Sequence, residues 1–157
     1  MSFPQDSTMK IVMNREMSRL LERMKIRASE LDQLRTLESM PTINASGCTF
    51  FREEYERNSH VRLEDFQDKT GYECFINHLH RPYSSDRSSL DAILAFVVGL
   101  SKALASTDGL KRFLTILSIG EGEEDCTVRF HECRPGESWI SGDLESYTEE
   151  AILLVST

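Results

Sequence analysis

The stretch "RFLTILSIGEGEEDCTVRFHEC" (residues 112–133) decides the fold that this sequence predicts. Its two ends are apolar and rich in β-branched and aromatic residues, and residues 126–133 alternate between apolar and polar side chains. Such a pattern with a period of two is typical of a strand with one buried face. Because the glycine-containing "GEGEED" (residues 120–125) lies between the two ends, we predict an antiparallel hairpin with strands at 112–119 and 126–133.

The segments before this hairpin follow helical spacing instead. Apolar residues recur at helical intervals over residues 10–24 and again over 31–37, and residues 68–80 place an apolar stripe on one helix face. Residues 90–107 are apolar nearly all round, which predicts a buried central helix. A final apolar run at 151–156 reads as a buried strand. We therefore predict an α+β domain, with N-terminal helices packed on a C-terminal antiparallel sheet of about three to four strands.

Length and composition fit one domain over residues 1–157, with residues 1–9 as a loose N-terminus. A chain of 157 residues, 39% of them hydrophobic and 28% charged, is long enough to bury a core without a disulfide. The longest apolar run, residues 92–100, is far shorter than the ~20 residues of a membrane span, and the first ten residues lack a signal-peptide core. We expect a cytoplasmic protein whose four cysteines are free thiols.

The net charge of −8 is concentrated in one segment. Residues 118–157 hold ten acidic and two basic residues, a balance that equals the excess of the whole chain. These carboxylates either keep the sheet soluble or attract a basic partner, and both interpretations stay open at this point. The same field repels nucleic acid, and basic residues do not cluster with aromatic ones, so we expect neither a nucleic-acid nor a membrane partner.

Cysteine and histidine residues raise the question of a metal. On the predicted strand 126–133, Cys126 faces one side, whereas His131 and Cys133 face the other, so these three residues do not converge. Cys74 and His78, four residues apart on a predicted helix, could complete a tetrahedral zinc site with them. The spacing matches no zinc signature, however, and buried thiols beside a structural histidine explain the same residues. We therefore predict no metal and no cofactor.

Catalytic motifs are missing from the sequence. Cys74 in the first turn of a helix, with His78 one turn further on, has the residue types of a thiol nucleophile and its base, but the sequence identifies no third group to orient the base. The chain has no phosphate-binding glycine loop, no dinucleotide fingerprint and no G-x-S-x-G elbow. We predict that the protein is not an enzyme.

The segment after the hairpin holds the only tryptophan of the chain. Trp139 follows a proline–glycine pair in a long connection and is surrounded by carboxylates. It either folds back onto the core or anchors an interface, where tryptophan is enriched. The candidate residues for binding a basic partner are Glu121, Glu123, Glu124, Asp125, Glu137, Trp139, Asp143 and Glu145.

Three stretches resemble the immunity proteins of bacterial contact-dependent growth inhibition systems. They are "TGYECFINHLH" (70–80), "FLTILSIG" (113–120) and "CTVRFHECRPGESWISGDLESYTEEAILLV" (126–155), and the resemblance extends over residues 68–157. It implies that the chain binds a cognate toxin C-terminal domain, often a nuclease, blocks its active site in the cytoplasm, and is not itself an enzyme. The family fixes no functional motif, so the candidate residues rest on charge and residue type alone.

Two other functions compete with that of an immunity protein. A type III-like secretion chaperone or adaptor is an alternative, because small acidic α+β proteins suit that role and the methionine-rich helix predicted at 10–24 could support a dimer. A small zinc or thiol enzyme built on Cys74, His78, His131 and Cys133 is the third.

Overall fold

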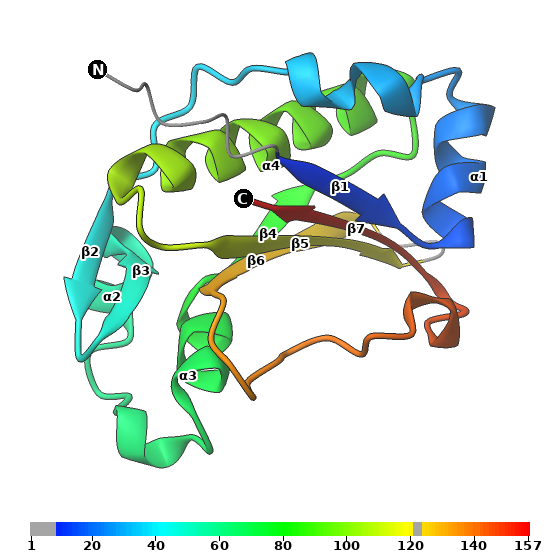
Figure 1. The fold of residues 1–157 in the computed structure, drawn as a ribbon. Helices are drawn as coiled ribbons and strands as arrows, with labels where there is room; N and C mark the ends of the chain where they lie inside the picture. Colours follow the sequence, from blue (N-terminus) through cyan, green and yellow to red (C-terminus); the bar gives the residue numbers. More distant parts are fainter. Residues whose placement is uncertain (1–8, 121–123) are drawn as a thin grey trace, which may run out of the picture.

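A five-stranded antiparallel sheet forms the centre of the protein in a computed structural model that describes residues 9–120 and 124–157 (Figure 1). The strand order is β1-β7-β5-β6-β4. The strands are β1 (Lys10–Met13), β4 (His78–Pro82), β5 (Phe113–Gly120), β6 (Asp125–Glu132) and β7 (Glu150–Ser156). The loose end predicted at residues 1–9 lies, apart from Met9, outside the described residues.

The predicted hairpin and the predicted last strand are confirmed, and they form the middle of the sheet. Strand β5 is central, with Leu117 paired to Val128 of β6 on one side and to Leu153 of β7 on the other. All three of these side chains are fully buried. The alternation of apolar and polar residues along β6 therefore identifies its buried face correctly.

The predicted arrangement of N-terminal helices on a C-terminal sheet is wrong, because strands are spread along the whole chain. Residues 10–24 do not form one helix: β1 pairs with β7 along the edge of the sheet, and α1 (Arg15–Arg23) begins only after Asn14. The helix predicted at 68–80 is α3 (Lys69–Ile76), and the chain then continues as β4, which pairs with β6. Both errors have the same cause, since short edge strands are specified by distant partners and not by local spacing.

The segment between the first and third helices also differs from the prediction. The helical pattern at 31–37 is a short 3-10 helix, η1 (Ala28–Gln33), followed by extended chain with Leu37 fully exposed. A two-stranded sheet comes next, with a short helix behind it. These elements are β2 (Thr42–Ala45), β3 (Cys48–Phe51), α2 (Arg52–Arg57) and the 3-10 helix η2 (Leu63–Asp65).

Helices α1 and α4 cover one face of the five-stranded sheet, which we call the first face (Figure 1). Helix α4 (Arg87–Thr107) begins at Asp86, whose carboxylate accepts a hydrogen bond from the Ser89 N–H. Its Leu94 and Val97 are fully buried in the main core. By length and composition α4 could cross a membrane, but 50% of its most apolar window is buried inside the protein, as in the core helix of a globular domain.

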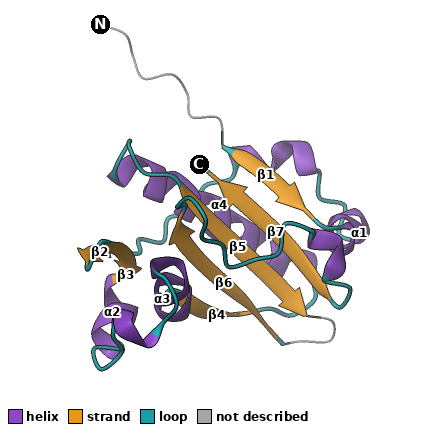
Figure 2. Ribbon diagram, turned by 60° about the horizontal axis from the view of Figure 1, so that its bottom comes forward, coloured by secondary structure: helices purple, strands orange, loops and turns teal. Residues whose placement is uncertain are grey.

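Helix α3 and the chain between β6 and β7 cross the opposite face, which we call the second face (Figure 2). We call residues 133–149 the connecting loop; it contains one short 3-10 helix, η3 (Leu144–Ser146). The two faces of the sheet are thus closed by different means, one by helices and the other largely by a loop.

A buried polar cluster joins α3 to both sheets. The carboxylate of Glu73, which is fully buried, accepts the backbone N–H groups of Thr49 (2.7 Å) and Glu132 (3.1 Å) and pairs with the Arg134 guanidinium. One turn further on, buried Asn77 accepts the N–H of Phe51 at 2.9 Å and donates to the carbonyl of Phe130 at 3.2 Å. Side chains of α3 therefore satisfy backbone groups that a neighbouring strand would otherwise bind.

Candidate functional site

Carboxylates gather at one end of the five-stranded sheet. Glu150 on β7 pairs with Gly120 at the end of β5, and Asp125 at the start of β6 pairs with Pro82 at the end of β4. Glu149 precedes Glu150 in the sequence, and Glu124 precedes Asp125, so β7 and β6 each begin beside two consecutive acidic residues. We call the set Glu124, Asp125, Glu149 and Glu150 the acidic end.

Most carboxylates of the acid-rich segment have no internal counter-ion. Of the eight acidic residues in the described part of 118–157, only Asp125 and Glu132 take part in ion pairs. Asp125 lies 3.0 Å from the Nδ1 atom of His80, and the Ser118 hydroxyl donates to Glu150 at 3.2 Å. Glu124, Glu149 and Glu150 are exposed. The acidic end therefore presents negative charge that the described part of the protein does not neutralise.

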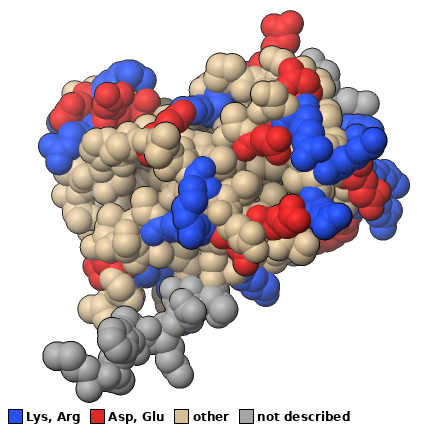
Figure 3. Space-filling model, turned by 90° about the horizontal axis from the view of Figure 1, so that it is seen from above, with Lys and Arg blue, Asp and Glu red and all other residues tan. Residues whose placement is uncertain are grey.

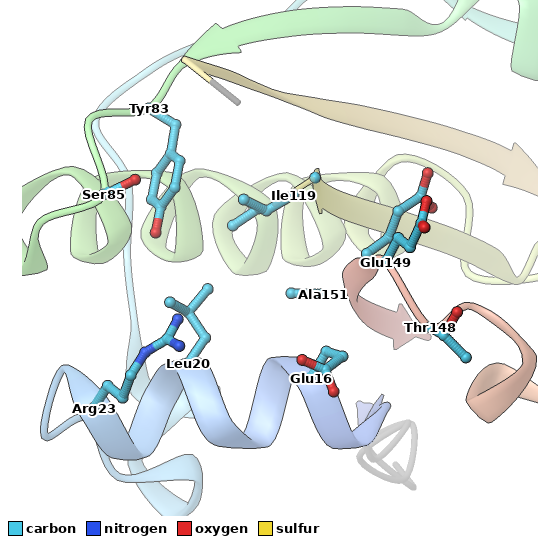
Figure 4. Close-up of a pocket in the computed structure, with 11 residues that line it drawn as sticks. Glu16, Leu20, Arg23, Tyr83, Ser85, Ile119, Thr148, Glu149 and Ala151 are labelled. Atoms are coloured by element: carbon cyan, nitrogen blue, oxygen red, sulfur yellow. The ribbon is translucent and has the colours of Figure 1, made fainter. Parts of the chain in front are cut away.

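Helix α1 borders the acidic end across a small pocket of about 130 Å³ (Figure 4). Glu16 of α1 and Glu149 line this pocket, with Arg23 about two turns further along the helix. Glu16 pairs with exposed Arg19 at 2.8 Å. Helix α1 is thus mixed in charge where it borders the acidic end, and the uncompensated carboxylates are those of the sheet.

Three of the carboxylates predicted to bind a partner hold the connecting loop in place. Glu137 accepts the Thr70 N–H at 3.0 Å, and this bond lowers the pKa of its carboxyl. Glu145 accepts the Arg15 N–H at 2.8 Å at the start of α1, and Asp143 accepts the Glu145 N–H at 3.2 Å. Asp143 and Glu145 are nevertheless exposed and still available to a partner.

Two other predicted residues, Glu121 and Glu123, lie outside the described residues. Sequence reasoning missed Glu149 and Glu150, which the structure brings next to Glu124 and Asp125. The signal was their place in the same acidic segment, but only the pairing of β7 with β5 puts them at that end of the sheet.

Trp139 packs on the second face of the sheet and remains partly exposed. Its ring lies over the Arg129 guanidinium, 4.8 Å from the ring centroid, and 46% of the residue is accessible. The ring is thus packed in part against the protein, and its role as an interface anchor stays a prediction. One part of the ring covers an arginine on β6, and the remainder is open to a partner.

The cysteine and histidine residues do not assemble into one site. Cys74 is fully buried in α3, whereas His78 lies on β4, because the helix ends at Ile76. His131 is buried and Cys133 exposed. Among residues 9–120 and 124–157 there is no group of three or more potential metal ligands.

Burial shapes the chemistry of these groups. It raises the pKa of the Cys74 thiol far above its usual range, which disfavours the thiolate that a nucleophile needs. Burial, reinforced by the neighbouring Arg129, lowers the pKa of His78 to about 4. At neutral pH this histidine is therefore uncharged.

The helical side of the molecule carries a different charge pattern. Seen from above α4, Lys and Arg side chains alternate with Asp and Glu side chains (Figure 3). Pairs such as Arg87 with Asp91 and Arg27 with Glu30 lie on α4 and η1. Charges on this side compensate one another locally, unlike those of the acidic end.

The chain belongs to the Uncharacterized protein PM0498 family, whose model matches residues 12–157. The match extends from β1 to the end of the chain, so it includes the acidic end and the connecting loop. No curated protein and no solved structure matches the chain.

Proposed function

We propose that this protein is an immunity protein of a contact-dependent growth inhibition system, which binds a cognate toxin domain and blocks its active site. The acidic end is the observation that carries the proposal. Its exposed carboxylates, Glu124, Glu149 and Glu150, have no ion-pair partner in the described part of the chain. The resemblance of residues 68–157 to such immunity proteins supports the same function.

The chemistry of a nuclease toxin explains why such a surface suits this role. A cleft that binds nucleic acid is basic, because it must pair with backbone phosphates. Carboxylates that project from one end of a rigid sheet imitate those phosphates, and a net charge of −8 accelerates the encounter with a basic domain. The exposed part of Trp139 offers an aromatic anchor beside this charge.

Calorimetric titration with the toxin domain encoded beside this gene tests the proposal. We expect tight binding that weakens as salt rises, because the interface is electrostatic. The charge-reversed variant Glu149→Lys is expected to lower affinity severalfold. The matched control is Glu56→Lys on α2, an exposed glutamate without an ion pair among the described residues, and its affinity should be unchanged.

Two outcomes contradict this function. One is the absence of binding to the toxin domain. The other is an equal loss of affinity in Glu56→Lys, because charge would then act through the net value and not through the acidic end. A dimer in solution that captures an extended segment of a client would favour a secretion chaperone instead.

A further inference from the structure

The connecting loop and the second face of the sheet line a pocket of about 170 Å³. Trp139 and Glu150, at its rim, also belong to the proposed toxin surface, whereas Arg129 and the isoleucines of the pocket do not. Its apolar lining comes from Ile116 and Ile152 of the sheet and from Ile140 and Trp139 of the loop. Thr127, Ser118 and Arg129 add polar groups from β5 and β6. Tyr147 and Glu150 complete the lining, so the pocket combines an apolar wall with several converging polar groups, as small-molecule sites do.

Arg129 is a half-buried cation without a carboxylate partner in the part of the chain that the structure describes. Its Nη1 atom donates to the Cys74 carbonyl at 3.1 Å, and its Nη2 atom lies 3.3 Å from both ring nitrogens of His78. That histidine is uncharged at neutral pH and supplies no counter-charge. The carbonyl end of α3 compensates the guanidinium only in part, so the site favours an anion.

The surroundings of Arg129 also orient its remaining donors. Trp139 covers the guanidinium at 4.8 Å, the bond to the Cys74 carbonyl uses an Nη1–H group, and the contact with neutral His78 uses an Nη2–H group. A guanidinium has five N–H groups in a planar fork, which matches the two oxygens of a carboxylate. Because the tryptophan covers one face of the guanidinium, a ligand would meet the remaining N–H groups in the plane of the guanidinium.

We propose that this pocket binds a small organic carboxylate, whose oxygens pair with Arg129 and whose apolar body contacts Ile116 and Ile152. The volume is below the ~300 Å³ of a drug-sized site, which limits the ligand to a few carbon atoms. Phosphate, which carries more negative charge than a monocarboxylate, fits less well, because the lining offers one cation, Arg129, together with an apolar wall and the acidic Glu150. This inference is independent of the proposed toxin binding.

The single tryptophan of the chain provides the readout. We would titrate the full chain with butyrate, with the neutral isostere butyramide and with inorganic phosphate, and follow Trp139 emission. Butyrate should give a saturable change, whereas butyramide and phosphate should bind at least tenfold more weakly. A butyrate response that does not saturate, or one that butyramide or phosphate matches, overturns the proposal.

Variants tie the response to the pocket. Arg129→Gln should weaken butyrate binding at least tenfold, and Arg112→Gln, an exposed arginine without an ion pair among the described residues, should not change it. Glu150→Gln should tighten butyrate binding severalfold, because it removes a negative charge from the lining. If folded Arg129→Gln binds butyrate like the wild type, the assignment is wrong.

A second variant covers the case in which Arg129→Gln does not fold. Thr127→Val keeps the volume and the cation but removes a hydroxyl from the lining, and circular dichroism verifies its fold. We expect severalfold weaker butyrate binding in Thr127→Val and a smaller thermal stabilisation by butyrate. If Thr127→Val binds butyrate with wild-type affinity and Arg129→Lys does not weaken binding either, butyrate does not bind in this pocket and the proposal is wrong.

Discussion

The two faces of the five-stranded sheet are closed in different ways. On the first face, α1 and α4 bury a continuous apolar core that includes Leu94 and Val128. On the second face, α3 and the connecting loop are held by individual polar contacts, and a pocket remains around Arg129. A sheet face covered by apolar packing is rigid and leaves no side chain free for a ligand. A face covered through a few individual hydrogen bonds keeps polar side chains available for a ligand.

Strand β6 shows how one sequence builds both faces. Val128 and Phe130 point to the first face and are fully buried. Arg129, between them, points to the second face, where Trp139 covers it. Because alternate side chains of a strand point to opposite faces, one set of β6 side chains stabilises the core and the other set lies on the face of the proposed ligand pocket.

The largest loss of stability is expected from Glu73→Ala on the second face. The change leaves the N–H groups of Thr49 and Glu132 and the charge of Arg134 without their acceptor, which costs about 3–5 kcal/mol. Urea unfolding measures the loss. The control Glu53→Ala, an exposed residue of α2, should stay within about 0.5 kcal/mol of the wild type. A small effect of Glu73→Ala would mean that polar contacts do not hold the second face.

A loss of similar or somewhat smaller size is expected from Leu94→Ala on the first face. Leu94 is fully buried between α4 and the sheet, and its truncation leaves a cavity that costs about 2–5 kcal/mol. Leu110→Ala, at a position that is 97% exposed, is the matched control and should unfold like the wild type. Equal midpoints for the two leucine variants would contradict the view of a sealed first face.

Asn14→Ala should have an intermediate effect, because Asn14 joins the two faces. Its side chain accepts the N–H groups of Met17 and Ile152 and donates to the Glu150 carbonyl at 2.8 Å. The loss of these bonds is expected to cost about 1–3 kcal/mol and to make the end of the connecting loop more sensitive to limited proteolysis. If stability falls while cleavage of the loop does not change, Asn14 serves only as the cap of α1.

The last expected effect concerns pH and His78. Its folded-state pKa, about 4, lies below the ordinary value of 6.5, so the unfolded chain binds more protons between these two pH values. Stability is therefore fully present above about pH 6.5 and falls as the pH decreases toward 4.

Urea unfolding at several pH values checks this dependence. The wild type should lose more stability than His78→Gln over the window from 6.5 to 4. Exposed His60 provides the control His60→Gln, which should keep the slope of the wild type. Parallel profiles for all three proteins would rule out the neutral histidine beside Arg129.

Sequence patterns predicted correctly the elements whose conformation is determined by residues close together in the sequence. The hairpin, the last strand and the long helix α4 could be recognised from periodicity and residue type. Strands β1 and β4 could not, since each has four or five residues and exists through a distant partner. The helix predicted over residues 10–24 fails for this reason.

The candidate site was predictable in charge but not in geometry. Composition indicated the acidic segment, yet it did not separate Glu137 and Glu145, which anchor the loop, from Glu149 and Glu150 at the acidic end. The contact of Trp139 with Arg129 joins two elements only after folding. No local pattern in the sequence predicts it.

Hydrogen exchange of this protein, free and mixed with the toxin domain encoded beside its gene, tests the central claim most directly. We predict that the toxin domain protects residues 124–125 and 139–150 and leaves unchanged the groove of about 640 Å³ between η1 and α4. Protection confined to that groove or to β2 and β3, or no protection anywhere, would contradict the proposal that the acidic end, with Trp139 of the connecting loop, forms the toxin-binding surface.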